Sequence, residues 1–261
     1  MERLTRWFEQ FLFPPGMTGG AVCTVTGSGG KTSLIWLLAQ NQRRRKVLVS
    51  PATKMYPPRP ELHRYDRYFS GGEGAGGIPG GLTPAGITLA GLLNKNTGKL
   101  EALPPDLLER IVSGYDLALL EGDGSQGLPL KGWADHEPVA PLFTTLTVGV
   151  IPAAPLGKKV SGDIIFRLPQ FIRLSGAKEG DTITPAHLAA VISGAGPGGG
   201  RSLFSVPRGR KLLFINQVED EARGEQAREV AARLPGEFLS GLEGIIAGSV
   251  KEDRAEVLYP P

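Results

Sequence analysis

One stretch near the N-terminus, residues 21–40, constrains the fold more than any other. It has the sequence AVCTVTGSGGKTSLIWLLAQ. Its first residues are apolar or β-branched, which predicts a buried parallel strand, and its last residues have apolar side chains at helical spacing. Between them lies a turn of small and polar residues: Gly27, Ser28, Gly29, Gly30, Lys31, Thr32 and Ser33. A strand, a glycine loop, a Lys-Thr pair and a helix in this order are typical of a nucleoside triphosphate site.

The chemistry of this turn explains the prediction. Glycines allow backbone N–H groups to turn inward around phosphate oxygens. The start of the helix adds unpaired N–H donors and a partial positive charge. In such a site Lys31 would reach the β- and γ-phosphates and the Thr32 hydroxyl would bind Mg²⁺. The alternative is a glycine-rich turn between a strand and a helix that carries a surface lysine.

The loop is shorter than the common G-x-x-x-x-G-K-[ST] pattern, because Val25 stands where that pattern has its first glycine. The sequence TGSGGKTS, residues 26–33, resembles the TGTNGKT[ST] loop of Mur-type and folylpolyglutamate ligases. The resemblance implies a compact version of the same phosphate cradle.

Length and composition exclude several classes of protein. The 261 residues can bury a large core, and the formal charge of +3 is too small to indicate nucleic acid as the main partner. Cys23 is the only cysteine, so no internal disulfide can form. The sequence has neither a signal peptide nor an apolar run long enough to cross a membrane, so we expect a cytoplasmic protein. We predict one domain over residues 1–261, with an N-terminal helix in residues 1–15 and a glycine-rich insertion at 71–98 that contains a small hairpin.

A second apolar run, residues 115–120, ends in acidic residues. Glu121 follows it directly, and Asp123 comes two residues later. A carboxylate at the tip of a strand beside a phosphate loop can orient Mg²⁺ directly or through water. We therefore expect Glu121, and after it Asp123, to be the acidic metal partner of Thr32. The alternative is a pair of capping acids in a turn. The Glu-Gly-x-Gly sequence here resembles the matching place in dethiobiotin synthetase-like enzymes.

The connection that follows, residues 125–138, is polar and interrupted by proline and glycine. It contains Lys131 and His136, which we expect to act on a second substrate, because loops on a rigid sheet commonly carry catalytic residues. Thr53 and Lys54 follow another predicted strand, residues 47–50, and are further candidates, since ligands gather at the carboxyl ends of parallel strands.

A late strand, residues 211–215, is followed by Asn216-Gln217-Val218-Glu219-Asp220. This segment resembles a degenerate NKxD element, with which G-domain proteins recognise the nucleotide base. The resemblance implies that Asn216 joins loops together and that Glu219, or Asp220 in its place, accepts hydrogen bonds from the base. Ser249, at the tip of the last predicted strand, would lie along the base. The alternative for Asn216 is an ordinary turn after a strand.

Several segments together resemble the YqeC family: TGSGGKTS, PATKM, LLEGDGSQGLPLKGWADHEPVAP and LLFINQVED. The most specific segment is residues 121–138, which is similar to the family's E-x-DGS-x-GLPLK…HEP pattern. The family resemblance implies an accessory protein in the maturation of selenium-dependent molybdenum hydroxylases. One departure is Phe166-Arg167, where the family pattern has a His-Arg pair.

The sequence therefore predicts an α/β protein with a mainly parallel, doubly wound sheet and helices on both faces, similar to P-loop NTPases. The expected cofactors are Mg²⁺ and ATP or GTP, and the expected function is nucleotide hydrolysis or a nucleotide-dependent switch. The expected protein partner is a molybdenum hydroxylase or a selenium-delivery protein. Two alternatives stay open: a small-molecule phosphotransferase or ATP-dependent ligase, and a non-hydrolysing binder of a nucleotide-bearing molybdenum cofactor.

Overall fold

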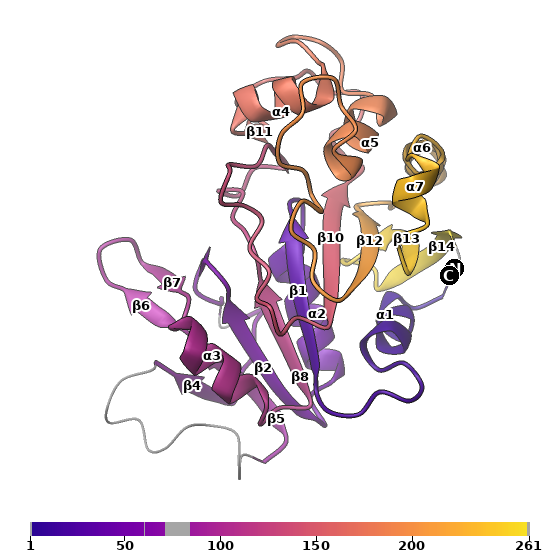
Figure 1. The fold of residues 1–261 in the computed structure, drawn as a ribbon. Coiled ribbons are helices and arrows are strands. Elements are labelled where there is room, and N and C mark those ends of the chain that lie inside the picture. The colour runs from indigo at the N-terminus through magenta and orange to yellow at the C-terminus, as the bar shows by residue number, and fades with distance from the viewer. Residues whose placement is uncertain (1, 60, 71–83, 260–261) are drawn as a thin grey trace.

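The computed structural model describes residues 2–59, 61–70 and 84–259 (Figure 1). Its central sheet consists of the strands β1 (Ala21–Gly27), β2 (Lys46–Pro51), β4 (Arg67–Phe69), β5 (Gly86–Ala90), β8 (Leu117–Glu121), β10 (Leu146–Pro152), β12 (Arg210–Asn216), β13 (Gly244–Ser249) and β14 (Arg254–Tyr259). Their spatial order is β14-β13-β12-β10-β1-β8-β2-β5-β4. All pairs are parallel except β13 with β14. The prediction of an α/β protein with a mainly parallel sheet is confirmed.

Helices cover both faces of this sheet. They are α1 (Leu4–Leu12), α2 (Lys31–Asn41), α3 (Pro105–Val112), α4 (Leu168–Ser175), α5 (Pro185–Ser193), α6 (Glu221–Ala232) and the short α7 (Gly236–Leu239). Alternate residues of the strands belong to different cores: Cys23 and Val25 pack with α1 and α2, whereas Val22 packs with α3. The β1–β10 register puts Ile151 on the same face as Val22, and Ile151 packs with α4, α5 and α6. All seven residues of β1 are buried, as expected for a strand covered on both sides.

Two small sheets stand at the carboxyl ends of the central strands. One consists of β3 (Lys54–Met55), β7 (Lys99–Glu101) and β6 (Leu92–Asn94), and the other pairs β9 (Leu130–Lys131) with β11 (Ile165–Phe166). The hairpin β6–β7 projects from the body of the molecule (Figure 1). A small hairpin is thus present, but it spans residues 92–101 and extends past the end of the predicted 71–98 insertion.

The extent of the predicted 71–98 insertion needs correction. Residues 71–83 lie outside the described residues. Gly86–Ala90 is β5, which pairs with β2 and β4 inside the central sheet, so this part is not an insertion. All five residues of β5 are buried. The sequence does not reveal this, because a five-residue apolar run fits a hairpin as well as a central strand.

Three other predicted elements differ in the structure. Residues 164–174, whose spacing predicts one helix, are divided, because Ile165–Phe166 pairs with β9 and Arg167 adopts a left-handed backbone before α4. The spacing also predicts a helix from Glu225, and the structure begins it at Glu221, where the Asp220 side chain accepts a hydrogen bond from the Arg223 N–H and caps α6. The antiparallel edge strand β14 was not predicted.

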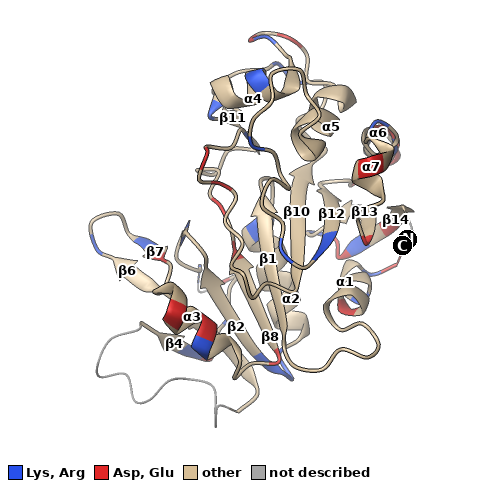
Figure 2. Cartoon of the chain, in the orientation of Figure 1, with Lys and Arg blue, Asp and Glu red and all other residues tan. Residues whose placement is uncertain are grey.

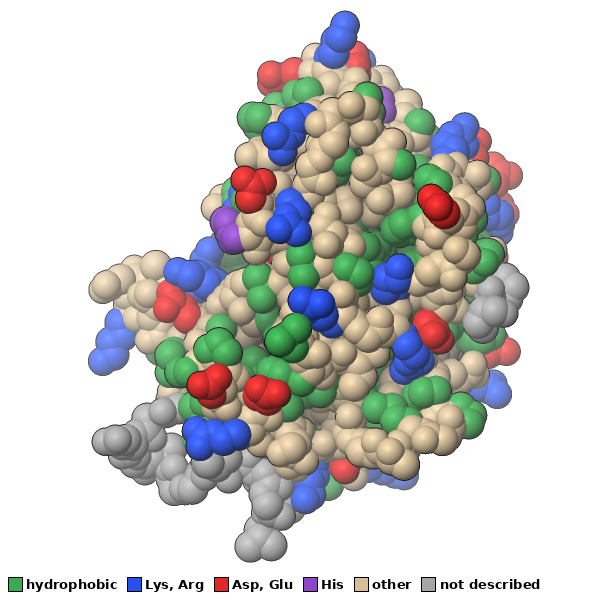
Figure 3. Space-filling model, viewed as in Figure 1, with side chains coloured by type: hydrophobic (Ala, Val, Ile, Leu, Met, Phe, Trp, Pro, Cys, Tyr) green, Lys and Arg blue, Asp and Glu red, His purple; other side chains and the backbone are tan. Residues whose placement is uncertain are grey.

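Charged side chains of both signs are distributed over the helices and loops (Figure 2). On the face seen in Figure 3, basic and acidic groups alternate with apolar ones, and neither sign dominates. No helix among the described residues is both long enough and apolar enough to cross a membrane.

Candidate functional site

The glycine loop between β1 and α2 makes unusually close approaches to the rest of the sheet. The φ angle of Gly27 is +99°, and a Cβ atom there would lie 2.0 Å from the Val150 carbonyl oxygen. The φ angle of Gly30 is +125°, and a Cβ atom there would lie 2.3 Å from Asn216 Nδ2. Only glycine fits these two positions, so the loop backbone itself forms the surface at the end of β1.

Helix α2 begins directly at the end of this loop. Its N-cap is Gly30, so no side chain satisfies the first N–H groups of the helix. These donors are available to a ligand, and the helix dipole favours an anionic one. Lys31, the first residue of α2, is buried, and its Nζ donates a hydrogen bond of 2.6 Å to the Gly27 carbonyl. The Lys31 side chain is therefore folded back against the glycine loop.

Thr32 and Glu121 meet across the gap between α2 and β8. The Thr32 hydroxyl donates a hydrogen bond of 2.8 Å to Glu121 Oε2. Burial raises the pKa of the Glu121 carboxyl above its ordinary value, and the Lys31 charge and the Thr32 hydrogen bond act in the opposite direction. The structure therefore brings together the hydroxyl and the carboxylate that the sequence predicted as metal ligands.

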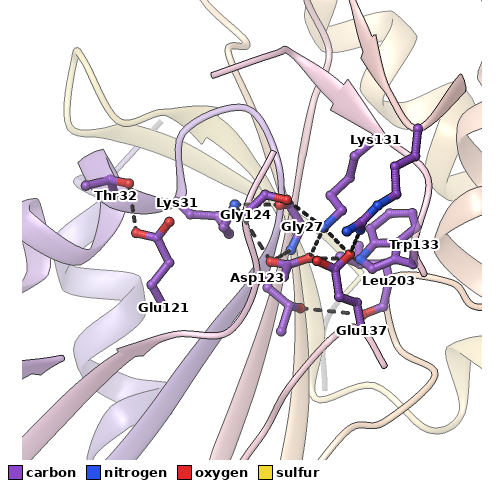
Figure 4. A network of polar contacts seen from close by, with 12 residues as sticks. Gly27, Lys31, Thr32, Glu121, Asp123, Gly124, Lys131, Trp133, Glu137 and Leu203 are labelled. Carbon is purple, nitrogen blue, oxygen red and sulfur yellow. Dashed lines mark hydrogen bonds and ion pairs between the residues drawn. The ribbon is translucent and has the colours of Figure 1, made fainter. Parts of the chain in front are cut away.

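Asp123 is the centre of a buried polar network (Figure 4). Its Oδ1 accepts a hydrogen bond of 2.8 Å from the Gly27 N–H and lies 3.7 Å from Lys31 Nζ. Its Oδ2 accepts hydrogen bonds from Lys131 Nζ at 3.0 Å and from the Trp133 indole N–H at 2.9 Å. Both oxygens of this fully buried carboxylate already have donors. This arrangement supports Glu121 rather than Asp123 as a metal ligand and makes Asp123 the residue that fixes the loop.

The network continues from Lys131 away from the loop. Lys131 Nζ also donates to the Gly124 carbonyl at 2.7 Å and to Glu137 Oε2 at 2.8 Å. Glu137 Oε2 pairs in turn with Arg167 Nη1. Lys131 is 1% exposed, so in this structure it is an internal cation rather than a group presented to a substrate. His136, the other residue predicted to act on an acceptor, is exposed at the rim of the neighbouring cavity.

A cavity of about 690 Å³ opens beside the loop. Its walls come from the glycine loop and α2, from β3 and β7, from the connection after β8 and from β11. Residues predicted for the site that line it are Gly29, Gly30, Lys31, Thr32, Ser33, Thr53, Lys54, Glu121 and His136. A volume of this size suits a ligand as large as a nucleotide.

Of the residues predicted to lie at the base, Asn216 contacts the glycine loop, whereas Glu219 and Ser249 do not. Asn216 donates to the Gly29 carbonyl at 2.8 Å and accepts from the Val250 N–H at 3.1 Å, so it joins the loop to the end of β13. Glu219 instead accepts a hydrogen bond from Arg223 at 3.1 Å. Ser249 is buried and accepts from the Glu252 N–H at 3.3 Å. Neither Glu219 nor Ser249 lines the cavity, and Asp220 is used as a helix cap.

Sequence reasoning missed other residues of the cavity. Tyr56 and Lys99 reach it from the small sheet β3-β7-β6, and Gln126, Arg167 and Gln217 reach it from loops. No local pattern marks these residues, because they lie in segments whose course is set by the small sheets. The φ angles of Gln126, Arg167 and Gln217 are +53°, +57° and +63°, which the sequence does not reveal either.

Fold and site together define the class of the protein. It is an α/β protein in which a glycine loop, joined to the first residues of a helix, lies at the carboxyl end of a central strand in a large, mostly parallel sheet. The chain belongs to the YqeC family: residues 23–169 match the family described as YqeC protein. The uncharacterized protein YqeC of Escherichia coli (strain K12) is 31% identical over 243 residues, which cover 90% of this chain and 89% of the relative. No solved structure matches the chain.

Proposed function

We propose that the protein binds a nucleoside triphosphate, ATP or GTP, together with Mg²⁺ in a P-loop-like site, and that it acts as a nucleotide hydrolase or switch. The observation that carries the proposal is the pairing of Thr32 with Glu121 at 2.8 Å beside the uncapped start of α2. A hydroxyl and a carboxylate at this place are the ligands that Mg²⁺ accepts next to a triphosphate.

The residues present fit this pair of ligands. Ser28 Oγ is buried and has no hydrogen-bond partner among the described residues, and a phosphate oxygen would supply one. The same part of the chain has no cluster of three or more His, Cys, Asp and Glu side chains that could hold a metal. This composition agrees with Mg²⁺, which proteins commonly hold through one or two carboxylates together with substrate phosphates.

Each residue would have a distinct task. The loop N–H groups and Lys31 would hold the phosphate oxygens and stabilise negative charge on the transferred phosphoryl group. Thr32 and Glu121 would hold Mg²⁺, which would neutralise charge between the β- and γ-phosphates. Asp123 would keep the loop open by holding the Gly27 N–H. Asn216 would fix the loop from the far side.

A thermal-shift panel of ATP, GTP and CTP with Mg²⁺ tests the proposal. A ligand present at a hundredfold excess over its Kd adds about 2.7 kcal/mol to the stability of the folded state. We expect one or more of these nucleotides to raise the melting temperature of the wild-type protein, and both Lys31→Ala and Thr32→Val to reduce the shift. Lys178→Ala, at an exposed lysine outside the cavity, is the matched control. A panel without any shift would contradict the proposal.

A phosphotransferase or ATP-dependent ligase is the second candidate. Its support is the extension of the cavity past the phosphate loop to His136 and Arg167, which leaves room for an acceptor. Release of ADP or pyrophosphate only after an acceptor is added would favour this candidate. Steady release without an acceptor would favour a hydrolase, and tight binding without release over hours would favour a non-hydrolysing binder of a nucleotide-bearing molybdenum cofactor.

The process that the protein serves is also a proposal. The resemblance to the YqeC family supports a role in maturing selenium-dependent molybdenum hydroxylases, with a hydroxylase or a selenium-delivery protein as partner. Deletion of the gene should lower the activity of such a hydroxylase in cells without lowering the amount of its polypeptide. Full activity in the deletion strain would contradict this role.

A further inference from the structure

Arg167 is fixed in the wall of the cavity by two neighbours. Its Nη1 pairs with Glu137 Oε2, and its guanidinium carbon lies 4.6 Å from the centre of the Phe166 ring. The side chain is 22% exposed. Among the described residues only Nη1 has a hydrogen-bond acceptor, so most of the five N–H donors of this arginine stay available.

Arg167 has an unfavourable, left-handed backbone conformation, and two other residues that line the cavity also have positive φ angles. Four non-glycine residues in the described part of the chain have positive φ angles, and three of them line this cavity: Gln126, Arg167 and Gln217. A left-handed conformation at such a residue is unfavourable and persists where the surrounding structure enforces it. Three polar side chains are thus held in costly conformations around one space.

Arg167 is joined to Lys31 through three other side chains of the buried network. Asp123, Lys131 and Glu137 stand between them, joined by contacts of 3.7, 3.0 and 2.8 Å and then by the Glu137–Arg167 pair. Lys31 and Arg167, which both line the cavity, are the two ends of this chain of charges. At the Lys31 end, the Glu121 carboxylate adds negative charge. At the Arg167 end, Glu137 Oε2 is shared by two cations, Lys131 and Arg167, so an anion beside Arg167 would add negative charge where it is short.

From this geometry we propose that Arg167 binds the oxyanion group, a phosphate or a carboxylate, of a second small molecule that occupies the cavity together with the nucleotide. The inference rests on the proposed function and adds the chemical class of the second ligand. Lys99 also lines the cavity and adds positive charge, with its Nζ 4.6 Å from the centre of the Tyr56 ring, whereas the charge of Lys54 is paired with Glu101.

The test uses the full chain saturated with Mg²⁺ and the non-hydrolysable β,γ-imido analogue of whichever nucleotide binds, so that the γ-phosphate position is filled. Inorganic phosphate and acetate are then titrated separately by calorimetry, and the comparison distinguishes a phosphate ligand from a carboxylate. We expect one of them to bind the wild-type protein and Arg167→Gln to weaken it at least about tenfold. Arg167→Lys, which keeps the charge, should bind with intermediate affinity. Arg173→Gln, at an exposed arginine on the helix α4 that follows Arg167, should bind as the wild type does.

Three results would overturn the inference alone, with nucleotide binding intact. The first is that neither anion binds the wild type. The second is that Arg167→Gln binds the anion as tightly as the wild type does. The third is that Arg167→Gln loses affinity for the triphosphate analogue but not for the nucleoside diphosphate. The last result would place Arg167 on the terminal phosphate instead. Failure of the wild type to bind any nucleotide would overturn the proposed function and this inference with it. Melting curves of each variant without ligand verify that it is folded.

Discussion

The Asp123 carboxylate and the Gly27 N–H are joined by a hydrogen bond of 2.8 Å, which ties the tip of β8 to the first glycine of the loop. The same carboxylate receives Lys131 and Trp133 on its other oxygen. One buried side chain therefore links the backbone of the glycine loop to Lys131 and Trp133 in the connection after β8.

We predict that Asp123→Asn destabilises the protein strongly. The substitution leaves Lys131 and Lys31 with less negative charge in a buried place, and breaking a buried ion pair in this way costs about 3–5 kcal/mol. Urea unfolding of the variant measures the loss. Asp163→Asn, at an exposed position, is the control and should change stability little. Equal stability of the two variants would show that Asp123 does not organise the loop.

Glu121→Gln should have opposite effects on stability and on ligand binding. Burial raises the pKa of Glu121 in the folded protein, so its ionised form is disfavoured there relative to the unfolded chain. The stability that this residue contributes is greatest below its unfolded pKa and is lost as the pH rises through the raised folded pKa. At neutral pH the glutamine variant should therefore be at least as stable as the wild type, while Mg²⁺-dependent nucleotide binding is reduced.

Urea unfolding between pH 4 and pH 8 measures the first effect, and nucleotide titration with and without Mg²⁺ measures the second. The difference in stability between Glu121→Gln and the wild type should shrink as the pH falls. Glu229→Gln, on the exposed side of α6, is the control for loss of one carboxylate. A wild type that becomes more stable relative to the variant as the pH rises would contradict the pKa direction.

Gly27→Ala should be much more damaging than Gly157→Ala. Both glycines have positive φ angles, +99° and +81°, so both substitutions introduce backbone strain of about 1–2 kcal/mol. At Gly27 the new Cβ would also lie 2.0 Å from the Val150 carbonyl oxygen, whereas nothing lies within 4 Å at Gly157. The melting temperatures of the two variants separate the clash from the strain. Equal losses would mean that the loop can shift away from β10.

Asn216→Asp should loosen the glycine loop while keeping the link to the end of β13. The aspartate can still accept from the Val250 N–H, but it cannot donate to the Gly29 carbonyl. Loss of one such hydrogen bond costs about 0.5–1.5 kcal/mol, and an unpaired buried carboxylate adds to the cost. We expect weaker binding of all nucleotides alike, measured by titration. A change confined to one base would instead assign Asn216 to base recognition.

Much of the central sheet was predictable from the sequence, because its strands are buried on both faces. In an α/β protein, continuous apolar runs such as residues 21–25 and 117–120 are typical of strands at the centre of a parallel sheet. The turn that follows the first run needs glycine for positive φ angles, so the loop and the helix that follows it could be located. The edge strand β14 was not predicted, and β5 was assigned to the inserted region, because a run of five or six residues does not distinguish a hairpin from a strand of the central sheet.

The site was predictable only in part. Residues next to a strand end, such as Thr32 and Glu121, could be paired because parallel strands bring their carboxyl ends to one edge. Glu219 was assigned from its position in a motif, yet its side chain pairs with Arg223 in the first turn of α6. Lys131 was expected to face a substrate, yet two carboxylates hold it inside the protein. Sequence spacing does not specify which partner a long charged side chain meets.

The sequence by itself determined the sheet's central strand, the glycine loop and the hydroxyl-bearing start of α2, because the local backbone conformation there allows few other residues. The tertiary structure decided which charges are buried together and which face the cavity. Arg167 reaches the cavity only because β11 pairs with β9, and residues 130 and 165 that begin this pairing are 35 positions apart in the chain. Contacts between segments so far apart depend on the packing of the whole sheet, which no local pattern encodes.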